Sequence, residues 1–268
     1  MTERTGAMIV DSHCHLHDPA FGDVRDTLRA ALFQDVYGVI AVGCDPATNI
    51  QTIVATTAAP KGVWGCLGFH PDWTHLTDED LDVVEEQLRA HHHRIVGLGE
   101  VGLPWYSLAD APDAATLMAR GRARLDRLLG LAVHYDLAVA LHAPHGAAVG
   151  ALEALKRHGI ERAVFHWHKA PAEVTRAIVD AGFLISVTPE VVYRERDREM
   201  VELVPIESLL VESDGPWKYS GEFTNMPSGP WMVARVAEEV AKLKGLPVED
   251  AMAQLTENAN RTFELTWA

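Results

Sequence analysis

The feature of this sequence that most restricts its fold is an eightfold alternation of short apolar strand signals with longer helical segments. Several strand signals are nearly unbroken apolar runs, such as those at residues 39–42 and 184–187. Runs of this kind are typical of parallel strands that are covered on both faces. The predicted strands span residues 8–15, 36–44, 63–70, 94–103, 137–142, 162–168, 183–189 and 208–214.

The segments between these strands carry helical signals. Residues 77–90 begin with a threonine and three acidic residues, as a capped helix does, and residues 116–135 place leucines at helical spacing. Residues 248–263 are expected to form terminal helices on the outside of a barrel. The sequence has no glycine-rich nucleotide loop of the doubly wound type. We therefore predict an α/β fold, a single (β/α)₈ TIM barrel, with residues 1–268 as one domain.

The charge balance restricts the partners of such a barrel. With 23 basic and 38 acidic residues the net charge is −15, which argues against a protein that coats nucleic acid through a broad basic face. A phosphate-containing substrate is still compatible, because bound divalent ions would supply positive charge locally. The apolar runs are far shorter than the roughly 20 residues that span a bilayer, so no membrane association is expected. No oligomeric state is predicted.

The cysteines point to the compartment. Cys14, Cys44 and Cys66 are odd in number and lie inside apolar runs, so a secreted disulfide framework is not expected. A reducing, cytoplasmic location is the corresponding prediction.

Candidate chemical groups collect at the ends of the predicted strands. Active sites of (β/α)₈ barrels form at the C-terminal ends of the strands, so this clustering predicts a functional site. His13 and His15 lie two positions apart, and because strand side chains alternate, both should project to the same side. The candidates are His13 and His15 on strand one, His70 on three, Glu100 on four, His142 on five, His166 on six and Asp214 on eight.

Imidazoles combined with carboxylates are typical of a transition-metal site. The set of His13, His15, Glu100, His142, His166 and Asp214 suits Zn²⁺ or Mn²⁺, with Co²⁺ or Fe²⁺ possible and Mg²⁺ less natural because it prefers oxygen ligands. One catalytic zinc needs three or four protein ligands. We therefore predict a centre of two divalent metal ions bridged by Glu100.

Sequence blocks along nearly the whole chain resemble the TatD-like metal-dependent hydrolases of the amidohydrolase superfamily. The blocks are Val-Asp-Ser-His-Cys-His-Leu from residue 10, Gly-Phe-His-Pro from 68, Gly-Leu-Gly-Glu-Val-Gly-Leu from 97 and Leu-Leu-Val-Glu-Ser-Asp-Gly-Pro from 209. The resemblance implies that one ion binds at His13 and His15, that another binds at His142 and His166, and that Glu100 bridges them. It also implies that Asp214 is a metal ligand and the general base, and that His70 orients the substrate.

The sequence departs from the family where substrate is expected. Ala143-Pro144 stand in place of a Ser-Arg pair after His142, and Trp167-His168-Lys169-Ala170 replace Cys-Phe-Ser-Gly after His166. The missing arginine removes a natural phosphate clamp. The predicted metal ligands are retained, whereas the residues expected to face the substrate differ. The sequence therefore supports hydrolysis more strongly than cleavage of DNA.

Three functions are considered. The first is a phosphodiesterase or deoxyribonuclease that acts on DNA ends through a metal-activated water, since many relatives of this family are deoxyribonucleases. The alternative is a metal-dependent hydrolase of a small ester, amide or lactone. The third is a barrel that has lost catalysis and serves as a binding partner. The complete ligand set argues against the third, because unpaired polar groups are costly to bury.

Several residues have two open interpretations. Asp11 could orient a ligand or accept a hydrogen bond at the end of the core, and Glu212 is interpreted as a hydrogen-bond partner of the site. His168 and Lys169 could bind substrate, or could cap a helix and carry a solvated charge. Four aromatic residues could contact a ligand or pack at the rim; they are Trp105, Tyr106, Trp167 and Trp217.

Overall fold

Eight parallel strands form one sheet whose spatial order follows the sequence from β1 to β8. The computed structural model describes residues 8–109 and 111–266. The strands are β1 (Ile9–Cys14), β2 (Val36–Val42), β3 (Val63–Leu67), β4 (Gly97–Gly102), β5 (Ala138–His142), β6 (Ala163–Phe165), β7 (Leu184–Val187) and β8 (Leu209–Val211). The helices are α1 (Val24–Leu32), α2 (Pro46–Ala58), α3 (Asp78–His91), α4 (Ala114–Tyr135), α5 (Ala147–His158), α6 (Ala172–Asp180), α7 (Glu195–Leu203), α8 (Val233–Lys244) and α9 (Val248–Phe263).

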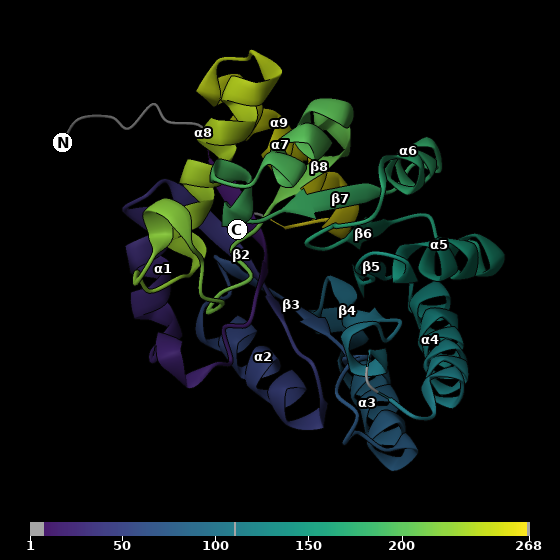
Figure 1. Cartoon of the computed structure of the whole chain (residues 1–268). Helices are drawn as coiled ribbons and strands as arrows, with labels where there is room; N and C mark the ends of the chain where they lie inside the picture. Colours follow the sequence, from purple (N-terminus) through teal and green to yellow (C-terminus); the bar gives the residue numbers. More distant parts are fainter. Residues whose placement is uncertain (1–7, 110, 267–268) are drawn as a thin grey trace.

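The first and last strands lie side by side, and two backbone hydrogen bonds join the chain at their ends. The amide of Asp214 donates to the carbonyl of His13 at 3.0 Å, and the amide of His15 donates to the carbonyl of Gly215 at 2.9 Å. The connecting helices follow one another around the outside of the strands (Figure 1). The predicted (β/α)₈ barrel is confirmed.

The predicted strands were too long at several ends. β3 ends at Leu67, β6 at Phe165 and β8 at Val211, three residues earlier than expected in each case. Arg94, predicted as the start of a strand, lies in the 3-10 turn His92–Arg94. Beyond the strand ends the backbone leaves the parallel ladder, so the residues there are positioned by loop conformation as well as by strand alternation.

Local capping explains where the helices begin. Thr77 is the N-cap of α3, and its hydroxyl accepts the amide of Asp80 at 3.2 Å while the Asp80 carboxylate accepts the amide of Thr77 at 2.8 Å. This reciprocal pair satisfies two backbone amides that the helix itself leaves without partners. None of the described helices is long and apolar enough to cross a membrane.

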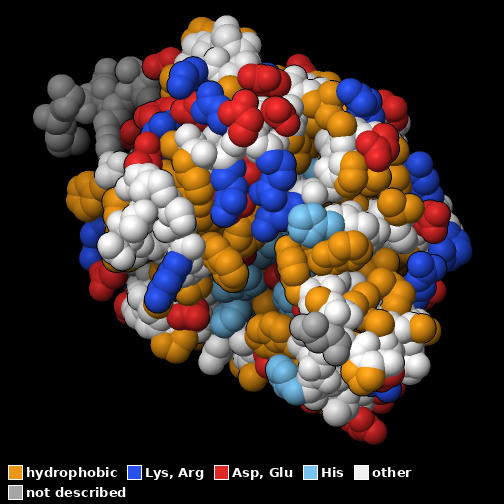
Figure 2. All heavy atoms as spheres, viewed as in Figure 1, with side chains coloured by type: hydrophobic (Ala, Val, Ile, Leu, Met, Phe, Trp, Pro, Cys, Tyr) orange, Lys and Arg blue, Asp and Glu red, His pale blue; other side chains and the backbone are white. Residues whose placement is uncertain are grey.

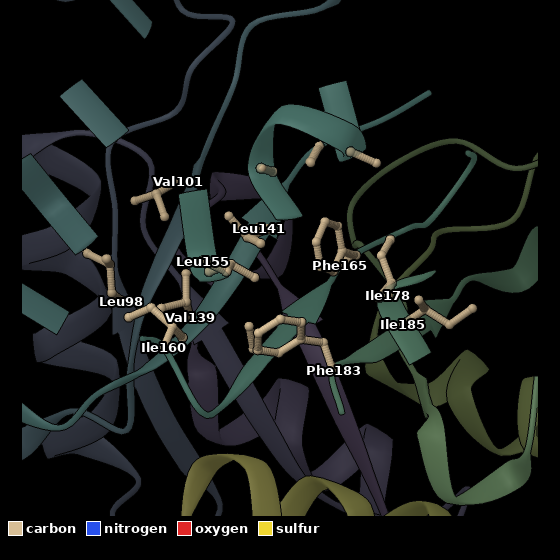
Figure 3. Packing of buried hydrophobic residues seen from close by; sticks show 14 of the residues in the cluster. Leu98, Val101, Val139, Leu141, Leu155, Ile160, Phe165, Ile178, Phe183 and Ile185 are labelled. Carbon is tan, nitrogen blue, oxygen red and sulfur yellow. The ribbon is translucent and has the colours of Figure 1, made fainter. Parts of the chain in front are cut away.

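One apolar layer lies between the strands and the surrounding helices. Leu141 of β5 and Phe165 of β6 point outward from the sheet and pack with Leu155 of α5 and Ile178 of α6 (Figure 3). All four side chains are buried. This layer fixes the helices on the barrel, so that the loops at the C-terminal ends of the strands start from rigid positions.

A second apolar cluster fills the inside of the barrel. It combines residues of seven strands with Ala259 and Phe263 of α9 and with Leu265, and it contains no residue of α1 to α8. A side chain on Gly97, the first residue of β4, would contact the Phe263 ring. The prediction that residues 248–263 pack on the outside was therefore wrong in part. α9 closes the N-terminal end of the barrel, which leaves the C-terminal end as the open mouth.

Replacement of Phe263 by alanine is expected to destabilise the protein by about 3 to 5 kcal/mol, because the substitution leaves a cavity in the inner cluster. Urea unfolding followed by circular dichroism measures the loss. Glu257→Ala on the exposed side of the same helix is the control and should change stability by less than about 0.5 kcal/mol. Equal stabilities of the two variants would contradict the role of α9 as a barrel seal.

Candidate metal centre

Glu100 lies at the middle of the barrel mouth, and the backbone around it is closely packed. Its amide donates to the carbonyl of Gly43 at 2.9 Å, and its carbonyl accepts the amide of Phe69 at 2.9 Å. A Cβ on Gly68 would come within 2.1 Å of the Glu100 amide nitrogen, so only glycine allows this approach of β3 to β4. The Glu100 side chain, which is 1% exposed, is thereby held at a fixed point.

One oxygen of Glu100 faces two histidines, His13 in β1 and His15 directly after β1. Glu100 Oε2 lies 3.5 Å from His13 Nε2 and 3.6 Å from His15 Nε2. Asp214 Oδ1 completes this group at 3.7 Å and 3.4 Å from the same two nitrogens. The other ring nitrogen of His15 lies 3.3 Å from the carbonyl oxygen of Val42, which directs Nε2 into the mouth.

The second oxygen of Glu100 faces a separate group of imidazoles. Glu100 Oε1 lies 2.6 Å from His142 Nδ1, 2.8 Å from His166 Nε2 and 3.3 Å from His70 Nε2. The structure thus brings together all seven residues that the sequence singled out at the strand ends. The two oxygens of one carboxylate divide them into two groups.

The donor atoms of these groups fit divalent cations. Both ring nitrogens of His13 and Oδ1 of Asp214 are buried and have no hydrogen-bond partner among the described residues. Such atoms are costly to bury unless something binds them. Three sets of ligand atoms within 4.8 Å of one another could each hold an ion: His13 with His15 and Glu100, His70 with Glu100 and His142, and His13 with His166 and Glu212.

The electrostatics of the mouth favour the ionised form of the Glu100 carboxylate. Burial acts to raise the pKa of Glu100, but the imidazoles of His166 and His70 outweigh it and hold that pKa well below its usual range. Burial and the neighbouring His166 ring lower the pKa of His13. Burial acts to lower the pKa of His142 and that of His166, but Asp72 and Glu100 outweigh burial at His142, and Glu100 outweighs it at His166, so both pKa values are raised. Because a neutral imidazole is the form that binds metal ions, these two rings release their protons when an ion binds.

Asp72 is part of this site and was missed in the sequence. Its Oδ2 lies 3.0 Å from His142 Nε2, the ring nitrogen opposite Glu100. Its Oδ1 accepts the amides of Trp105 and Ser107, each at 2.9 Å, and the Ser107 hydroxyl at 2.7 Å. Asp72 therefore holds the His142 ring in one orientation, the usual role of a carboxylate behind a metal-binding histidine.

Glu212 takes the same position behind His166. Its Oε1 lies 3.3 Å from His166 Nδ1 and accepts the amide of Trp167 at 2.8 Å. This agrees with its interpretation as a hydrogen-bond partner, although Glu212 with His13 and His166 is also close enough to hold an ion. Asp11 accepts the amides of His13 and Ser213 and the Ser213 hydroxyl, so it fixes backbone where β1 meets the segment after β8.

A cavity of about 610 Å³ opens above the two ligand groups. Figure 2 shows histidine side chains in a central hollow, with hydrophobic, Lys and Arg side chains beside it. Tyr106, Trp167 and Trp217 of the predicted aromatic set line the cavity, and the sequence did not single out a fourth, Trp73. Trp105 is not among the lining residues; it lies beside His145 instead.

His168 and Lys169 differ in their surroundings. His168 is 1% exposed, its Nε2 lies 2.8 Å from the Thr175 hydroxyl in α6, and burial lowers its pKa to about 3. It is a neutral packing residue next to a helix. Lys169 is partly buried and lines the cavity.

The model of the family described as TatD related DNase matches residues 10–264. The chain belongs to this family. It is accordingly a metal-dependent hydrolase. An uncharacterized metal-dependent hydrolase of Haemophilus influenzae is 27% identical over 96% of this chain and 100% of its own length. Deoxyribonuclease TATDN3 of Homo sapiens is 29% identical over 96% of this chain and 95% of its own length.

Solved structures of TatD proteins have the same architecture. The crystal structure of YJJV, a TatD homolog from Escherichia coli, superposes with a TM-score of 0.85 at 26% identity and covers 96% of this chain and 98% of that one. A TatD-family hydrolase of Entamoeba histolytica, at 17% identity, gives a TM-score of 0.79 over 97% of this chain and 99% of its own. The second likeness shows a shared fold.

Asp72→Asn is expected to weaken binding of Zn²⁺ or Mn²⁺ by about 10- to 100-fold, because the His142 ring loses the carboxylate that orients it. Isothermal titration of chelator-treated protein measures the affinity. Asp250→Asn, a change of the same kind at an exposed position of α9, should leave it unchanged. An Asp72→Asn protein that binds either ion as tightly as the parent would show that Asp72 does not support the ligand.

Proposed function

We propose that this protein is a divalent-metal-dependent phosphodiesterase that cleaves DNA. The observation that carries the proposal is the division of the mouth by Glu100, whose two oxygens face separate groups of imidazoles. A bridging carboxylate between two ions is the arrangement that two-metal phosphodiesterases use to hold both the attacking and the leaving oxygen. The relative of Homo sapiens that is named a deoxyribonuclease, aligned along nearly the whole chain, favours DNA over a small ester, amide or lactone.

In this proposal each ion has its own ligands. His13, His15 and Asp214 hold one ion, His142 and His166 hold the other, and Glu100 binds both. The mixed nitrogen and oxygen donors favour Zn²⁺ or Mn²⁺, with Mg²⁺, Co²⁺ or Fe²⁺ as weaker candidates. The free, buried thiols of all three cysteines support a cytoplasmic location.

When bound, the ions lower the pKa of water and polarise a phosphoryl oxygen. Asp214 is then the general base. Burial acts to raise its pKa, but His15 outweighs burial and lowers it, so the carboxylate is ionised and can accept a proton from water. His70 Nδ1 accepts the amide of Asp72 at 3.2 Å, which leaves the ring proton on Nε2. That N–H lies 3.3 Å from Glu100 Oε1, and because His70 also lines the cavity, the N–H can donate instead to an oxygen of the phosphate.

The cavity above the centre suits an unpaired end of a nucleic acid. Tyr106 and Trp217 line the cavity and are exposed, so their rings offer faces on which bases can stack. A net charge of −15 opposes binding along an extended duplex, so the substrate has to enter at its end, where only a few phosphates approach the protein.

Asp214→Asn is expected to lower kcat for metal-dependent cleavage of a single-stranded oligonucleotide by about 10²- to 10⁴-fold, because the amide cannot accept the proton from water. Product release from a labelled strand, measured on metal-loaded protein whose metal content is checked by elemental analysis, provides the rate. Asp180→Asn on the surface of α6 is the control. If the metal-loaded parent protein cleaves no oligonucleotide, the proposal fails.

Metal ions are also expected to stabilise the folded chain. At a 100-fold excess over Kd, a bound ion adds about 2.7 kcal/mol to the free energy of unfolding and raises Tm by roughly 5 to 10 °C. His13→Ala and His142→Ala should each reduce the gain, whereas His93→Ala, at an exposed position of the 3-10 turn after α3, should retain it. Equal gains in all three variants would show that the ions bind elsewhere.

A further inference from the structure

Lys169 lies between two cavities. It lines the 610 Å³ cavity above the metal centre, and it also lines a second cavity of about 180 Å³ between the start of α6 and α7. Its position, three residues after His166, lies where the sequence departs from the family. A group held at the metal centre therefore shares its cavity with Lys169.

The chain around Lys169 is firmly anchored. The Trp167 amide donates to Glu212 Oε1 at 2.8 Å and to the Ser186 hydroxyl at 3.1 Å, and the indole N–H donates to Glu190 Oε2 at 3.2 Å. The next residue, His168, is buried against Thr175. Lys169 Nζ lies 3.5 Å from the centre of the Trp167 ring, a cation–π contact that holds the ammonium at the cavity wall.

The charge of Lys169 is available for a ligand. Among the described residues no carboxylate oxygen lies within 4.0 Å of its Nζ, whereas the neighbouring Arg194 and Arg196 are both paired with Glu190. Lys169 offers an unpaired cation on the same cavity.

We propose that Lys169 is a specificity-determining residue that binds a non-scissile phosphate of the substrate strand. The inference rests on the proposed phosphodiesterase function and deepens it, because it names a nucleic acid with at least two phosphates as the substrate class. The scissile phosphate lies at the metal centre, and the adjacent phosphate lies against Lys169 Nζ. A lysine acts as a point charge on phosphate and needs no particular base. The strand then continues along the second cavity.

Lys169→Gln removes the charge, keeps the side chain polar and shortens it by one heavy atom. On a single-stranded oligonucleotide of about six residues, KM should rise about tenfold with a much smaller change in kcat. The slope of log KM against log salt concentration should fall by about 0.7 to 1, because one phosphate contact is lost. On bis(p-nitrophenyl) phosphate, which has a single phosphate, the rise in KM should be markedly smaller. Lys169→Arg should restore the salt slope.

Lys61→Gln, on the exposed loop at the opposite end of the barrel, is the matched control and should retain the parent salt slope. An unchanged slope in Lys169→Gln would overturn the inference. An equal fall of kcat on both substrates would also overturn it, because Lys169 would then act on the reacting group rather than on a neighbouring phosphate.

Binding separates this inference from the proposed function. The Kd of the oligonucleotide is measured with metal-loaded Asp214→Asn protein and with the same protein carrying Lys169→Gln. If binding weakens about tenfold in the double variant, the inference is supported, even when the parent protein cleaves no strand. The absence of cleavage would remove only the proposed reaction. Cleavage by the parent combined with equal Kd values would remove the inference and leave the reaction in place.

Discussion

The buried carboxylate of Glu100 is the group on which the architecture of the barrel mouth depends. It is almost inaccessible to water, and five imidazoles from four strands and their ends surround its two oxygens. Burying an ionised carboxylate is costly unless opposite charge or hydrogen bonds compensate it. The nearby imidazoles favour the ionised carboxylate, but the lone pairs of buried atoms such as Oδ1 of Asp214 are left without hydrogen-bond partners among the described residues. Cations bound between the two groups would satisfy the carboxylate and the lone pairs together.

Precision in such a centre comes from the groups behind the ligands. Asp72 contacts the far nitrogen of His142, and Glu212 contacts the far nitrogen of His166, so each ring has a carboxylate on the side opposite Glu100. These carboxylates are themselves held by amides of the loops that line the cavity, including those of Trp105 and Trp167. The ring orientations are thus coupled to the substrate-facing loops. A change in those loops can alter substrate choice and also reach the metal ligands.

The fold and the residues of the centre could be predicted from the sequence because strand repetition and barrel geometry are periodic. Eight strand signals imply closure, and closure brings the strand ends together whatever the loops do. The failures lie where the backbone leaves the periodic pattern. Asp72 lies beyond β3 in a loop that no strand alternation places, and Trp167 has a left-handed φ of 39°, which breaks the alternation after His166 and directs His168 into the core. The inward packing of Phe263 depends on the direction in which α9 crosses the barrel end, which sequence periodicity does not contain.

The net charge of the protein and the local charge inside the barrel mouth have opposite effects on a nucleic acid. The contrast between them determines how a nucleic acid could approach. A net charge of −15 repels a polyanion at a distance of several ångströms, although salt screens this repulsion beyond about 8 to 10 Å. Inside the mouth the sign would reverse on metal binding, because bound cations together with Lys169 would form a small positive region at the floor and wall of an aromatic cavity. A strand end can enter the cavity and is attracted there, whereas the surface of a duplex cannot enter it. Attraction that is confined to the cavity therefore favours strand ends. In the proposed function, specificity for strand ends follows from the contrast between surface charge and cavity charge and requires no contact that reads a base.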